Sequence, residues 1–589
     1  MQMFKMFKNL TKKEILFFII SVVFIVIGVF ADLKIPDYMQ EITILVQTEG
    51  STISDILVQG GYMLGCALIS LVTAVVVGYF AAYIGTSFEK HLRSKIFNKV
   101  TDFGMEEIKN FSTSSLITRS TNDVTQVKMF VVVAIQMLIK APIMATVAIG
   151  KIANKGWEFS LITLIGVLIV LVMVIALVLL VLPKFKKVQK LMDKINGLTR
   201  ENLTGIRVVR AYNAEEYQQD KFEVVNDELN RTQIFNQKTM ALMSPVMSTV
   251  MSGLSLAIYW VGAYLINEAA MLDKMTIFGN MVTFSSYAVQ VIMSFVMLVM
   301  LFIIYPRASV SAKRLNEVLD TEPHMKDGKV DEDITELKGE VEFRNVSFKY
   351  PDAEEYILEN ISFVAHRGET VAFIGSTGSG KSTLINLIPR FYDVTDGEVL
   401  IDGIDVRDMK REYLNNKLGY ISQRAVMFKG SIKENVTLGH SLKGKPDDKR
   451  IDDAIRVAQA SEFVTKMPDG VETEVSQSGT NLSGGQKQRL SIARAIARDP
   501  EIYIFDDSFS ALDYKTDFAL REDLKKYTRN ATILIVAQRI GTIKDADRII
   551  VLDQGKCVGM GTHKELLSSC EVYKEIASSQ LTKEELENA

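Results

Sequence analysis

Long stretches without charged side chains dominate the first half of the chain. Five of them cover residues 15–31, 56–88, 159–183, 239–267 and 275–306. Each is about 17 residues or longer, which lets a helix cross the hydrocarbon core of a bilayer. A sixth stretch, residues 129–150, is interrupted only by Lys140. We predict a span there too, because an odd number of spans would place the basic segments of the chain on opposite sides of the membrane. Such a lysine must face the bundle interior, pair with an acid or reach the interface.

Basic residues are unevenly distributed among the connections between these spans. Residues 89–128 and 184–238 carry 7 and 11 Lys or Arg, whereas the three other connections together carry four. Because basic connections remain on the cytosolic side, both long connections and both termini are expected in the cytosol. The Lys-rich start lacks a small-residue cleavage pattern after its apolar run, which indicates a retained span rather than a signal peptide.

Both long connections show apolar positions at helical spacing. We therefore expect the membrane helices to continue into the cytosol, joined by short transverse helices near residues 112–127 and 201–216 that could contact a cytosolic domain. This predicts a six-helix, all-α transmembrane domain over residues 1–306 with two cytosolic coupling helices. The charged and polar residues 307–339 are expected to form a linker.

From residue 340 to residue 589 the pattern changes to short β-branched runs that alternate with amphipathic stretches. The expected strands are residues 341–348, 370–374, 417–421, 502–505, 532–536 and 549–552. Such alternation is typical of an α/β domain with a mainly parallel sheet.

Composition and charge agree with two different surroundings. Mean hydropathy is +0.16 and the net charge is −3, divided into +6 for residues 1–310 and −9 for the rest. The balance argues against a nucleic-acid partner, which needs a basic patch. The widely spaced Cys66, Cys557 and Cys570 show neither a disulfide framework nor the spacing of a zinc site.

A phosphate-binding loop is the clearest chemical signal. The expected strand at residues 370–374 runs into Gly375, Ser376, Thr377, Gly378, Ser379, Gly380, Lys381, Ser382 and Thr383, and an apolar helix follows. This fits the pattern G-x-x-x-x-G-K-S in its strand–loop–helix context, rather than a chance glycine-rich turn. Backbone N–H groups would converge on the β-phosphate, Lys381 would reach the β- and γ-oxygens, and Ser382 would offer a hydroxyl to Mg²⁺.

Two further motifs complete a nucleotide site. The apolar residues 502–505 end in Asp506 and Asp507, so a buried strand would deliver Asp506 to Mg²⁺ and place Asp507 for the attacking water. A second anion cradle before a helix consists of Ser483, Gly484, Gly485 and Gln486. Because the chain already has a phosphate loop, this second cradle implies the nucleotide of an opposing subunit.

With these motifs the chain resembles, over nearly its full length, an ATP-binding-cassette exporter half-transporter of the bacterial multidrug type. The segments at residues 116–123 and 201–213 resemble those that flank the family's coupling helices, and residues 140–142 resemble its third span. The resemblance implies a six-helix transmembrane domain fused to an α/β P-loop nucleotide-binding domain in the bacterial cytoplasmic membrane. It also implies ATP and Mg²⁺ as cofactors, and a second half-transporter and the lipid bilayer as partners.

The resemblance assigns roles to three more residues. Tyr350 would stack on adenine, although an ordinary strand aromatic remains an alternative. Gln423 would reach Mg²⁺ and the water while sensing the coupling helices. Asp513 would lie at the dimer interface, where a helix cap is the alternative.

Three positions depart from the family pattern. Asp507 stands where the family has its general base Glu, Gln538 where it has a His that contacts the γ-phosphate, and Gln477 where an acidic residue usually faces the partner's coupling helix. The shorter carboxylate moves by roughly 1.5 Å, and misplacement of about 1 Å can cost about 10²-fold in rate. Gln538 donates a hydrogen bond but cannot carry a proton at neutral pH.

These departures favour the degenerate-site half of a heterodimeric exporter, because the signature at Ser483–Gln486 is intact while the base is weak. The expected mechanism is alternating access, with hydrolysis mainly at the site that joins the partner's Walker motifs to this signature. A homodimer with two slow sites and an ATP-gated regulator or channel are the alternatives.

The transported substrate is less defined by the sequence. An amphiphilic or drug-like compound would suit a Met-rich wall, although plain packing explains the same spacing of Met240, Met243, Met247, Met251, Met293 and Met297. Lys140 and Gln136 could face the cavity and favour anionic groups, or have a structural role.

Overall fold

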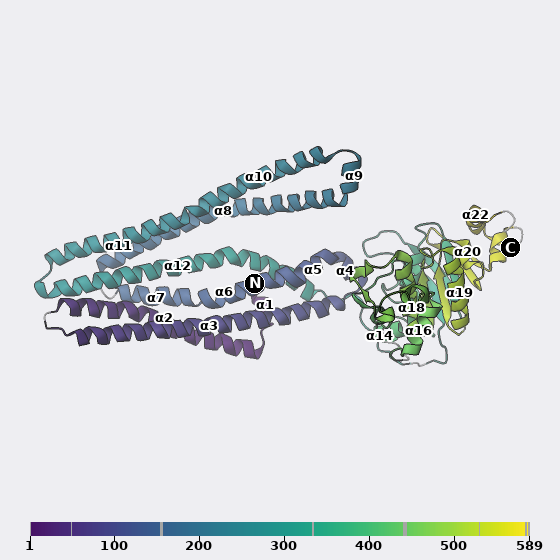
Figure 1. Ribbon diagram of the computed structural model, residues 1–589, viewed down its shortest axis with the longest axis horizontal. Helices are drawn as coiled ribbons and strands as arrows, with labels where there is room; N and C mark the ends of the chain where they lie inside the picture. The colour runs from purple at the N-terminus through teal and green to yellow at the C-terminus, as the bar shows by residue number, and fades with distance from the viewer. Residues whose placement is uncertain are drawn as a thin grey trace. The chain divides into compact units, whose positions relative to one another are not determined.

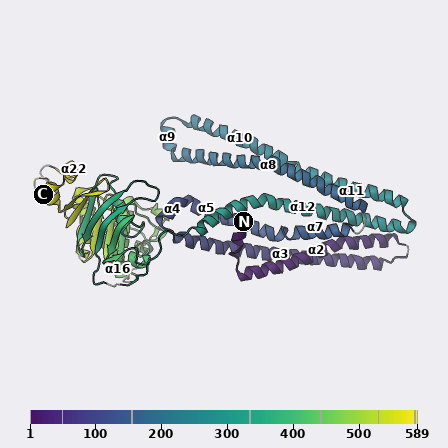
Figure 2. The same ribbon diagram turned by 180° about the vertical axis from the view of Figure 1, so that it is seen from behind.

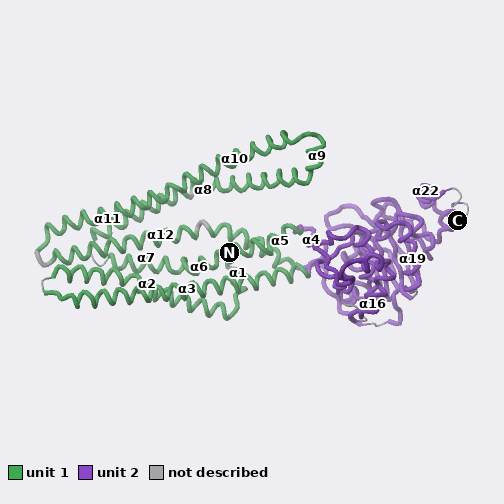
Figure 3. The backbone as a smooth tube through the Cα atoms, in the orientation of Figure 1, with its two compact units in different colours: residues 1–101, 113–321 green, residues 102–112, 322–589 purple. Residues whose placement is uncertain are grey.

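The computed structural model describes residues 2–48, 50–153, 157–332, 335–439, 444–528, 530–582 and 586. It divides into two compact units, drawn in Figure 3: unit 1 comprises residues 1–101 and 113–321, and unit 2 comprises residues 102–112 and 322–589. Residues 154–156 of the predicted third-to-fourth connection, residues 333–334 of the predicted linker, and part of the predicted C-terminal end lie outside the described residues.

Unit 1 is a bundle of long helices (Figure 1). Its helices are α1 (Gln2–Phe7), α2 (Lys12–Gln47), α3 (Ile53–Thr101), α5 (Thr113–Thr118), α6 (Val124–Met137), α7 (Lys140–Ala153), α8 (Trp157–Thr204), α9 (Ile206–Ala211), α10 (Glu215–Ala241), α11 (Met243–Glu268) and α12 (Met271–Asp320), with a π-helical turn at Arg119–Asp123. Among the described residues, six helical stretches are long and apolar enough to cross a membrane. This confirms the predicted six-helix architecture, including the stretch that contains Lys140.

The longest helices extend beyond a bilayer. Helix α3 has 49 residues and α12 has 50, and at 1.5 Å per residue each measures about 75 Å, more than twice the ~30 Å of a hydrocarbon core. The prediction that membrane helices continue well past the apolar stretches is therefore confirmed.

The linker prediction was wrong for residues 307–320, which continue α12 to Asp320. Pro306 lies inside the helix and removes only one backbone hydrogen bond. The turns that follow it are held by packing, because Ala308, Ala312, Leu315 and Val318 are completely buried. Tertiary contacts thus override the helix-breaking tendency of proline.

The first predicted range, 112–127, contains the short helix α5 and the π-helical turn, and a further short helix precedes that range. It is α4 (Met105–Phe111), whose first turn is capped by a hydrogen bond from the Gly104 N–H to the Glu107 carboxylate at 2.9 Å. Ser112 ends it with a left-handed φ of 56°, and the following residues begin the next long helical stretch. The second predicted range, 201–216, contains the short helix α9.

Helices α8 and α10 form a separate two-helix arm that ends in α9, as Figures 1 and 2 show from opposite sides. Leu191 of α8 and Val225 and Leu229 of α10 pack between the two helices. An ion pair between Lys187 and Glu228 at 2.6 Å joins them at the surface. The arm carries α9 away from the helices of its own unit.

Unit 2 contains two main sheets. The strands are β1 (Val341–Phe348), β2 (Leu358–Ala365), β3 (Thr370–Gly375), β4 (Asp396–Ile401), β5 (Ile404–Asp405), β6 (Leu418–Ile421), β7 (Gly430–Ser431), β8 (Glu474–Val475), β9 (Ile502–Asp506), β10 (Thr532–Val536), β11 (Arg548–Asp553) and β12 (Lys556–Gly561). The larger sheet has the order β12-β11-β3-β10-β9-β6 and is parallel except for β12. β1 instead belongs to an antiparallel sheet of order β2-β1-β4-β5, which the sequence pattern had not separated.

A hydrophobic core lies on each face of the larger sheet. Ten α-helices besides α4 lie in the described part of unit 2. They are α13 (Lys381–Asn386), α14 (Arg411–Lys417), α15 (Ile432–Val436), α16 (Asp448–Val457), α17 (Ser461–Val464), α18 (Gly484–Arg498), α19 (Tyr514–Tyr527), α20 (Ile540–Ile543), α21 (His563–Ser569) and α22 (Glu571–Gln580). Every residue of β9 is buried. Ile502 and Ile504 join one hydrophobic core and Tyr503 and Phe505 the other, because side chains alternate between the faces of a strand.

Candidate nucleotide site

The candidate nucleotide site lies at one edge of the parallel sheet. β3 leads into the glycine-rich loop and α13, β9 ends at Asp506, Gln423 follows β6, and Gln538 follows β10. Carboxyl ends of parallel strands meet at the same edge, which is where α/β sheets bind ligands. The fold therefore brings together four segments that are far apart in the sequence.

The loop after β3 has a compact, cradle-like backbone. Gly380 adopts a left-handed φ of 92°, and a Cβ atom there would lie 2.7 Å from a methyl carbon of Leu358, so only glycine fits. Lys381 Nζ donates to the carbonyls of Gly375 at 2.9 Å and Ser376 at 2.7 Å, and to Ser379 Oγ at 3.2 Å. Ser376, Thr377 and Gly378 form the exposed rim of the loop.

Ser382 and Asp506 meet across the base of the loop. Ser382 Oγ donates to Asp506 Oδ1 at 2.8 Å, and Asp506 is buried. Both are hard oxygen donors of the kind that Mg²⁺ prefers, and a hydroxyl and a carboxylate at this spacing can contact one ion. The donor set thus fits magnesium on its chemistry.

Asp507 is held by two amides. One oxygen, Oδ2, accepts a hydrogen bond from Gln538 Nε2 at 2.8 Å and another from Gln423 Nε2 at 3.3 Å. The backbone of Asp507 has a left-handed φ of 45°, and its N–H donates to the Val536 carbonyl at 3.0 Å. Sequence reasoning selected these three side chains separately, and the structure joins them in one cluster.

Burial dominates the electrostatics of this site. It raises the pKa of both Asp506 and Asp507 above the usual aspartate value. The hydrogen bonds from Ser382 to Asp506 and from Gln423 to Asp507 oppose this rise. Burial also lowers the pKa of Lys381, while the charges of Asp507 and Asp506 oppose that shift. The pocket is therefore less favourable to charge than water is, which strengthens the attraction for a polyphosphate with its cation.

An aromatic group stands beside the loop. Tyr350 Oη and Thr383 Oγ1 are 3.1 Å apart, so the tyrosine predicted for adenine is adjacent to the helix that follows the phosphate loop. Tyr392, which the sequence analysis did not select, meets Tyr350 edge-on with ring centroids 5.3 Å apart. No motif marks Tyr392, and only the folded chain places it there.

The signature segment begins helix α18 and is open to solvent. Ser483 Oγ accepts from the Gln486 N–H at 3.3 Å, and Gln486 Oε1 accepts from the Ser483 N–H at 2.9 Å, which makes a capping box. Ser483 and Gly484 are exposed, and a Cβ on Gly484 would meet nothing within 4 Å. Gly485 is half-buried, near the Ala511 carbonyl. The helix start thus presents open backbone N–H groups.

Two other predicted residues lie at the surface. Asp513 caps α19, where Oδ1 accepts from the Thr516 N–H at 3.0 Å, so the cap considered as an alternative is present. Gln477 is exposed in a short 3₁₀ turn before the signature segment.

Helix α4 packs within unit 2. Lys109 Nζ lies 3.4 Å from an Asp352 carboxylate oxygen and 5.8 Å from the ring centroid of Tyr350. A short helix from between the membrane segments therefore contacts the aromatic residue predicted to stack on adenine. Neither contact follows from a sequence motif.

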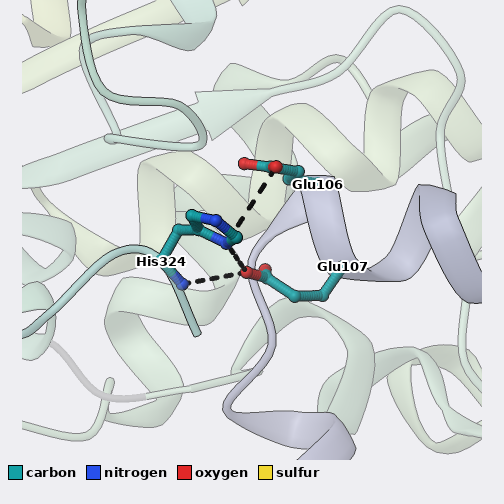
Figure 4. A group of neighbouring side chains, drawn as sticks. All are labelled: Glu106, Glu107 and His324. Atoms are coloured by element: carbon teal, nitrogen blue, oxygen red, sulfur yellow. Dashed lines mark hydrogen bonds and ion pairs between the residues drawn. The ribbon is translucent and has the colours of Figure 1, made fainter. Parts of the chain in front are cut away.

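A second α4 contact involves Glu106, Glu107 and His324, drawn in Figure 4. Glu107 Oε1 accepts from the His324 backbone N–H at 2.9 Å and lies 3.2 Å from its Nδ1. Burial acts to raise the pKa of Glu107. Hydrogen bonds, of which the one from the His324 backbone has the largest effect, hold this pKa below its usual value. The hydrogen bond to Glu107 and the charge of Glu106 raise the pKa of His324. The buried glutamate already has protein donors, so this cluster links two segments.

The membrane residues selected from the sequence divide into two groups. Lys140 and Gln136 line a cavity of unit 1, and Lys140 also lines another that includes Met293 and Met297. Met243, Met247 and Met251 instead belong to the hydrophobic core of the bundle.

Sequence reasoning missed Asp32, which pairs with Lys140 at 3.1 Å. Its position at the end of a charge-free stretch was the available signal.

Comparisons with known proteins agree with this architecture. The family model described as ABC transporter transmembrane region matches residues 18–295, and the model described as ABC transporter matches residues 358–510. The chain therefore belongs to the ABC transporter family. It is a half-transporter in which a membrane domain and an ATPase are fused, and it binds ATP, which drives export across a membrane.

Individual relatives cover nearly the whole chain. An uncharacterized ABC transporter ATP-binding protein of Mycobacterium tuberculosis is 38% identical over 94% of each chain. The multidrug resistance ABC transporter ATP-binding and permease protein of Lactococcus lactis is 30% identical over 97% of this chain and 94% of its own. A solved bacterial Atm1-family ABC exporter with ATP bound has a TM-score of 0.79, covering 96% of this chain and 98% of that one; at 22% identity it shows a shared fold. A half-transporter of this kind works with a second subunit.

Proposed function

We propose that this chain is the degenerate-site half of a heterodimeric exporter that moves amphiphilic or drug-like compounds out of the cell. It binds ATP at its own phosphate loop and contributes its signature segment to the site where the partner hydrolyses ATP. The observation that carries the proposal is the state of Asp507, whose short carboxylate is held by Gln423 and Gln538.

The Asp507 cluster is poorly suited to general-base catalysis. A base must reach the attacking water within hydrogen-bonding distance and pass its proton on. Oδ2 of Asp507 accepts from two amides instead, and neither amide can take up a proton at neutral pH. Slow hydrolysis at this site would let its nucleotide persist while the partner's site turns over.

ATP would be held here by the residues that the fold brings to the sheet edge. Lys381 and the backbone of residues 375–380 would contact the phosphates, and Tyr350 would stack on adenine. Ser382, Asp506 and Gln423 would hold Mg²⁺, which neutralises charge on the β- and γ-phosphates. The 2.8 Å contact between Ser382 and Asp506 supports this assignment.

The signature segment and the α8–α10 arm support a second subunit. Ser483 and Gly484 are exposed at a helix start with room for a phosphate. At the tip of the arm, Val208, Tyr212 and Tyr217 are 61%, 79% and 66% exposed. Apolar side chains at the end of a projecting arm suit contact with another chain, and we assign them to the partner's nucleotide-binding domain.

The basic connections support a membrane orientation with both termini and unit 2 in the cytosol of a bacterial cell. The printed name of the Lactococcus lactis relative supports drug-like cargo. Closure of the nucleotide-binding domains on ATP would be transmitted through α4 and α9 to the membrane helices, and hydrolysis at the partner's site would reopen them.

The test is ATP hydrolysis and binding by this chain with and without its co-expressed partner. The chain alone should bind ATP with Mg²⁺ yet hydrolyse it at no more than a few per cent of the assembled rate, following the roughly 10²–10⁴-fold cost of a lost base. Co-purification of a similar-sized chain should accompany full activity. Full turnover by this chain alone would show a homodimer instead, and ATP binding without movement of any compound would show a regulator or channel.

A further inference from the structure

An ion pair between α2 and α7 contributes to the lining of two cavities of unit 1. Lys140 Nζ lies 3.1 Å from Asp32 Oδ2, and the Ser70 hydroxyl donates to the other oxygen of the same carboxylate. One cavity, of about 360 Å³, is lined by both charged residues, and the other, of about 260 Å³, is lined by Lys140 and Ser70. Lys140 interrupts one predicted span and Asp32 directly follows another. Charged side chains at such positions are costly and are usually functional.

One helical stretch is broken, and the other lacks a backbone hydrogen bond, where they carry these charges. Pro36 lies in α2 four residues after Asp32, so the Asp32 carbonyl has no helical N–H donor. Helix α6 ends at Met137 and α7 starts at Lys140, with Pro142 in its first turn. Interrupted helices with freed backbone groups are how membrane transporters build polar binding sites.

The larger cavity also contains an acceptor without a donor. Gln290 Oε1 is buried and has no hydrogen-bond partner among the described residues. The neighbouring Ser286 and Ser294 hydroxyls donate to carbonyls of their own helix, α12. A buried acceptor left unpaired costs about 1–3 kcal/mol, so a ligand N–H group would be favoured there.

The remaining wall of the larger cavity is apolar. Met144, Met293 and Met297 line it together with Ile35 and Pro36. Methionine side chains are flexible and polarizable and adapt to alkyl chains of different shape. The cavity therefore combines one charge of each sign, an unpaired acceptor and a wall for a hydrocarbon tail.

A second pair between the same helices provides a contrast. Asp37 of α2 forms an ion pair with Lys151 of α7, and Tyr287 Oη donates to Asp37 Oδ1 at 2.5 Å. Lys151 also donates to the Leu33 carbonyl at 3.0 Å. This pair lines neither of the two cavities, and its dense hydrogen bonding indicates a structural role.

We propose that the Asp32–Lys140 cavity binds the headgroup of a zwitterionic amphiphile that carries a primary ammonium and a phosphate or carboxylate. Asp32 and Gln290 accept from the ammonium, Lys140 contacts the anionic group, and the tail lies along the methionines. Asp32 and Lys140 neutralise each other before the ligand binds. Only a ligand with both charges can separate them, give each side chain a new partner and keep the low-dielectric cavity neutral. A primary ammonium, unlike a quaternary one, has N–H groups for Gln290.

This inference rests on the proposed export of amphiphiles and narrows its substrate class. The test uses the complete transporter, solubilised and titrated with three lysolipids of one acyl chain: lysophosphatidylethanolamine, lysophosphatidylcholine and lysophosphatidylglycerol. Native mass spectrometry gives the dissociation constant of each. The ethanolamine lipid should bind roughly tenfold more tightly than the other two, because it alone satisfies Asp32, Lys140 and Gln290.

Three variants locate the preference. Asp32→Asn with Lys140→Met should bring the three constants within about twofold of each other, since hydrogen bonds to charged groups carry the discrimination. Gln290→Leu, which leaves the ion pair intact, should reduce only the preference for ethanolamine over choline, since Asp32 still accepts from the ammonium. Asp37→Asn with Lys151→Met, the matched control between the same helices, should keep the full preference. A monodisperse size-exclusion profile of each variant, equal to that of the unmodified transporter, shows that the transporter has folded.

Two outcomes overturn the inference in distinguishable ways. Equal binding of the three lysolipids by the unmodified transporter, or an equal loss of preference in the control pair, would refute this headgroup site while leaving amphiphile export standing. Absence of binding by all three would refute the proposed amphiphilic cargo together with it.

Discussion

Both units hold charged side chains that are partly or fully buried, but these side chains find their partners in different ways. In unit 2, Lys381 begins α13 and Asp506 ends β9 at one edge of the sheet. Each belongs to a motif that can be recognised alone, and each contacts other residues of the site. In unit 1, Lys140 and Asp32 are partners on different helices, and no motif links them. A motif predicts the local backbone geometry around its residues. A charged residue within a predicted span predicts only that it has some partner, and not which residue that partner is.

The comparison also concerns what happens when one group is removed. The nucleotide edge is exposed to ligands, so a lost donor there should alter turnover. The Asp37–Lys151 pair of the bundle lines neither cavity, so a lost partner there should alter stability.

The largest effect is expected at the signature segment. Ser483→Ala in the assembled transporter should lower ATP turnover roughly 10²-fold, the usual cost of losing one positioned donor to a reacting phosphate or oxyanion. Ser431 provides the matched control, because it caps α15 with the same box through Glu434. Ser431→Ala should cost the same ~1 kcal/mol of cap stability with turnover unchanged. Steady-state ATPase assays of both variants test this prediction. Equal losses of turnover would mean that Ser483 only caps its helix.

The next effect is expected in the bundle. Asp37→Asn should destabilise unit 1 by about 2 kcal/mol, because it leaves the Lys151 ammonium with a neutral partner in place of a charged one. The affinity for ATP should not change. Thermal unfolding and nucleotide binding of the same preparation test this prediction. Adding Lys151→Met should recover part of the loss, and a parallel fall in ATP affinity would contradict the separation of the two units.

Restoring the family pattern should activate this site. Asp507→Glu with Gln538→His returns a longer base and a side chain that can carry a proton, so hydrolysis by this chain should rise roughly tenfold or more. ATPase activity measured in a pair whose other site is inactivated gives the result. An unchanged rate would mean that features other than these two residues limit hydrolysis.

Asp507→Asn alone should have a small effect. A carboxylate already held by two amides contributes little as a base, so turnover of the pair should fall less than about threefold, against ~10²–10⁴-fold for removal of the partner's base. Both single variants are assayed for ATPase activity and transport in the same pair. Equal losses would make this half a full catalytic partner.

The smallest effect is a pH dependence at the contact between α4 and His324. Because the folded pKa of His324 is raised, its stabilising contribution is present below pH ~6.5 and is lost as the pH rises through the raised value. The lowered pKa of Glu107 has the opposite pH dependence. Its stabilising contribution is present above pH ~4.3 and is lost as the pH falls through the lowered value. The melting temperature should therefore fall slightly between pH 6 and 8, and His324→Gln should remove that slope. An unchanged slope would exclude His324 as its source.

Local patterns were sufficient for much of this protein. Six spans, an α/β domain, the strand before the phosphate loop and the buried strand before Asp506 all follow from the spacing and type of apolar residues. The glycine-rich loop is recognisable because its backbone conformation needs glycine at named positions such as Gly380. These features depend on neighbours in the sequence, so the sequence alone determines them.

Other features depend on packing between distant segments, and only the tertiary structure decided them. Helix α12 passes Pro306 because buried residues beyond it supply contacts that outweigh one lost hydrogen bond. The assignment of β1 to a separate antiparallel sheet and the binding of Asp507 by both Gln423 and Gln538 arise from strand order. Asp32 becomes the partner of Lys140 because α2 and α7 lie side by side. Burial sets how strongly a charge needs a partner, and the fold selects which side chain provides it.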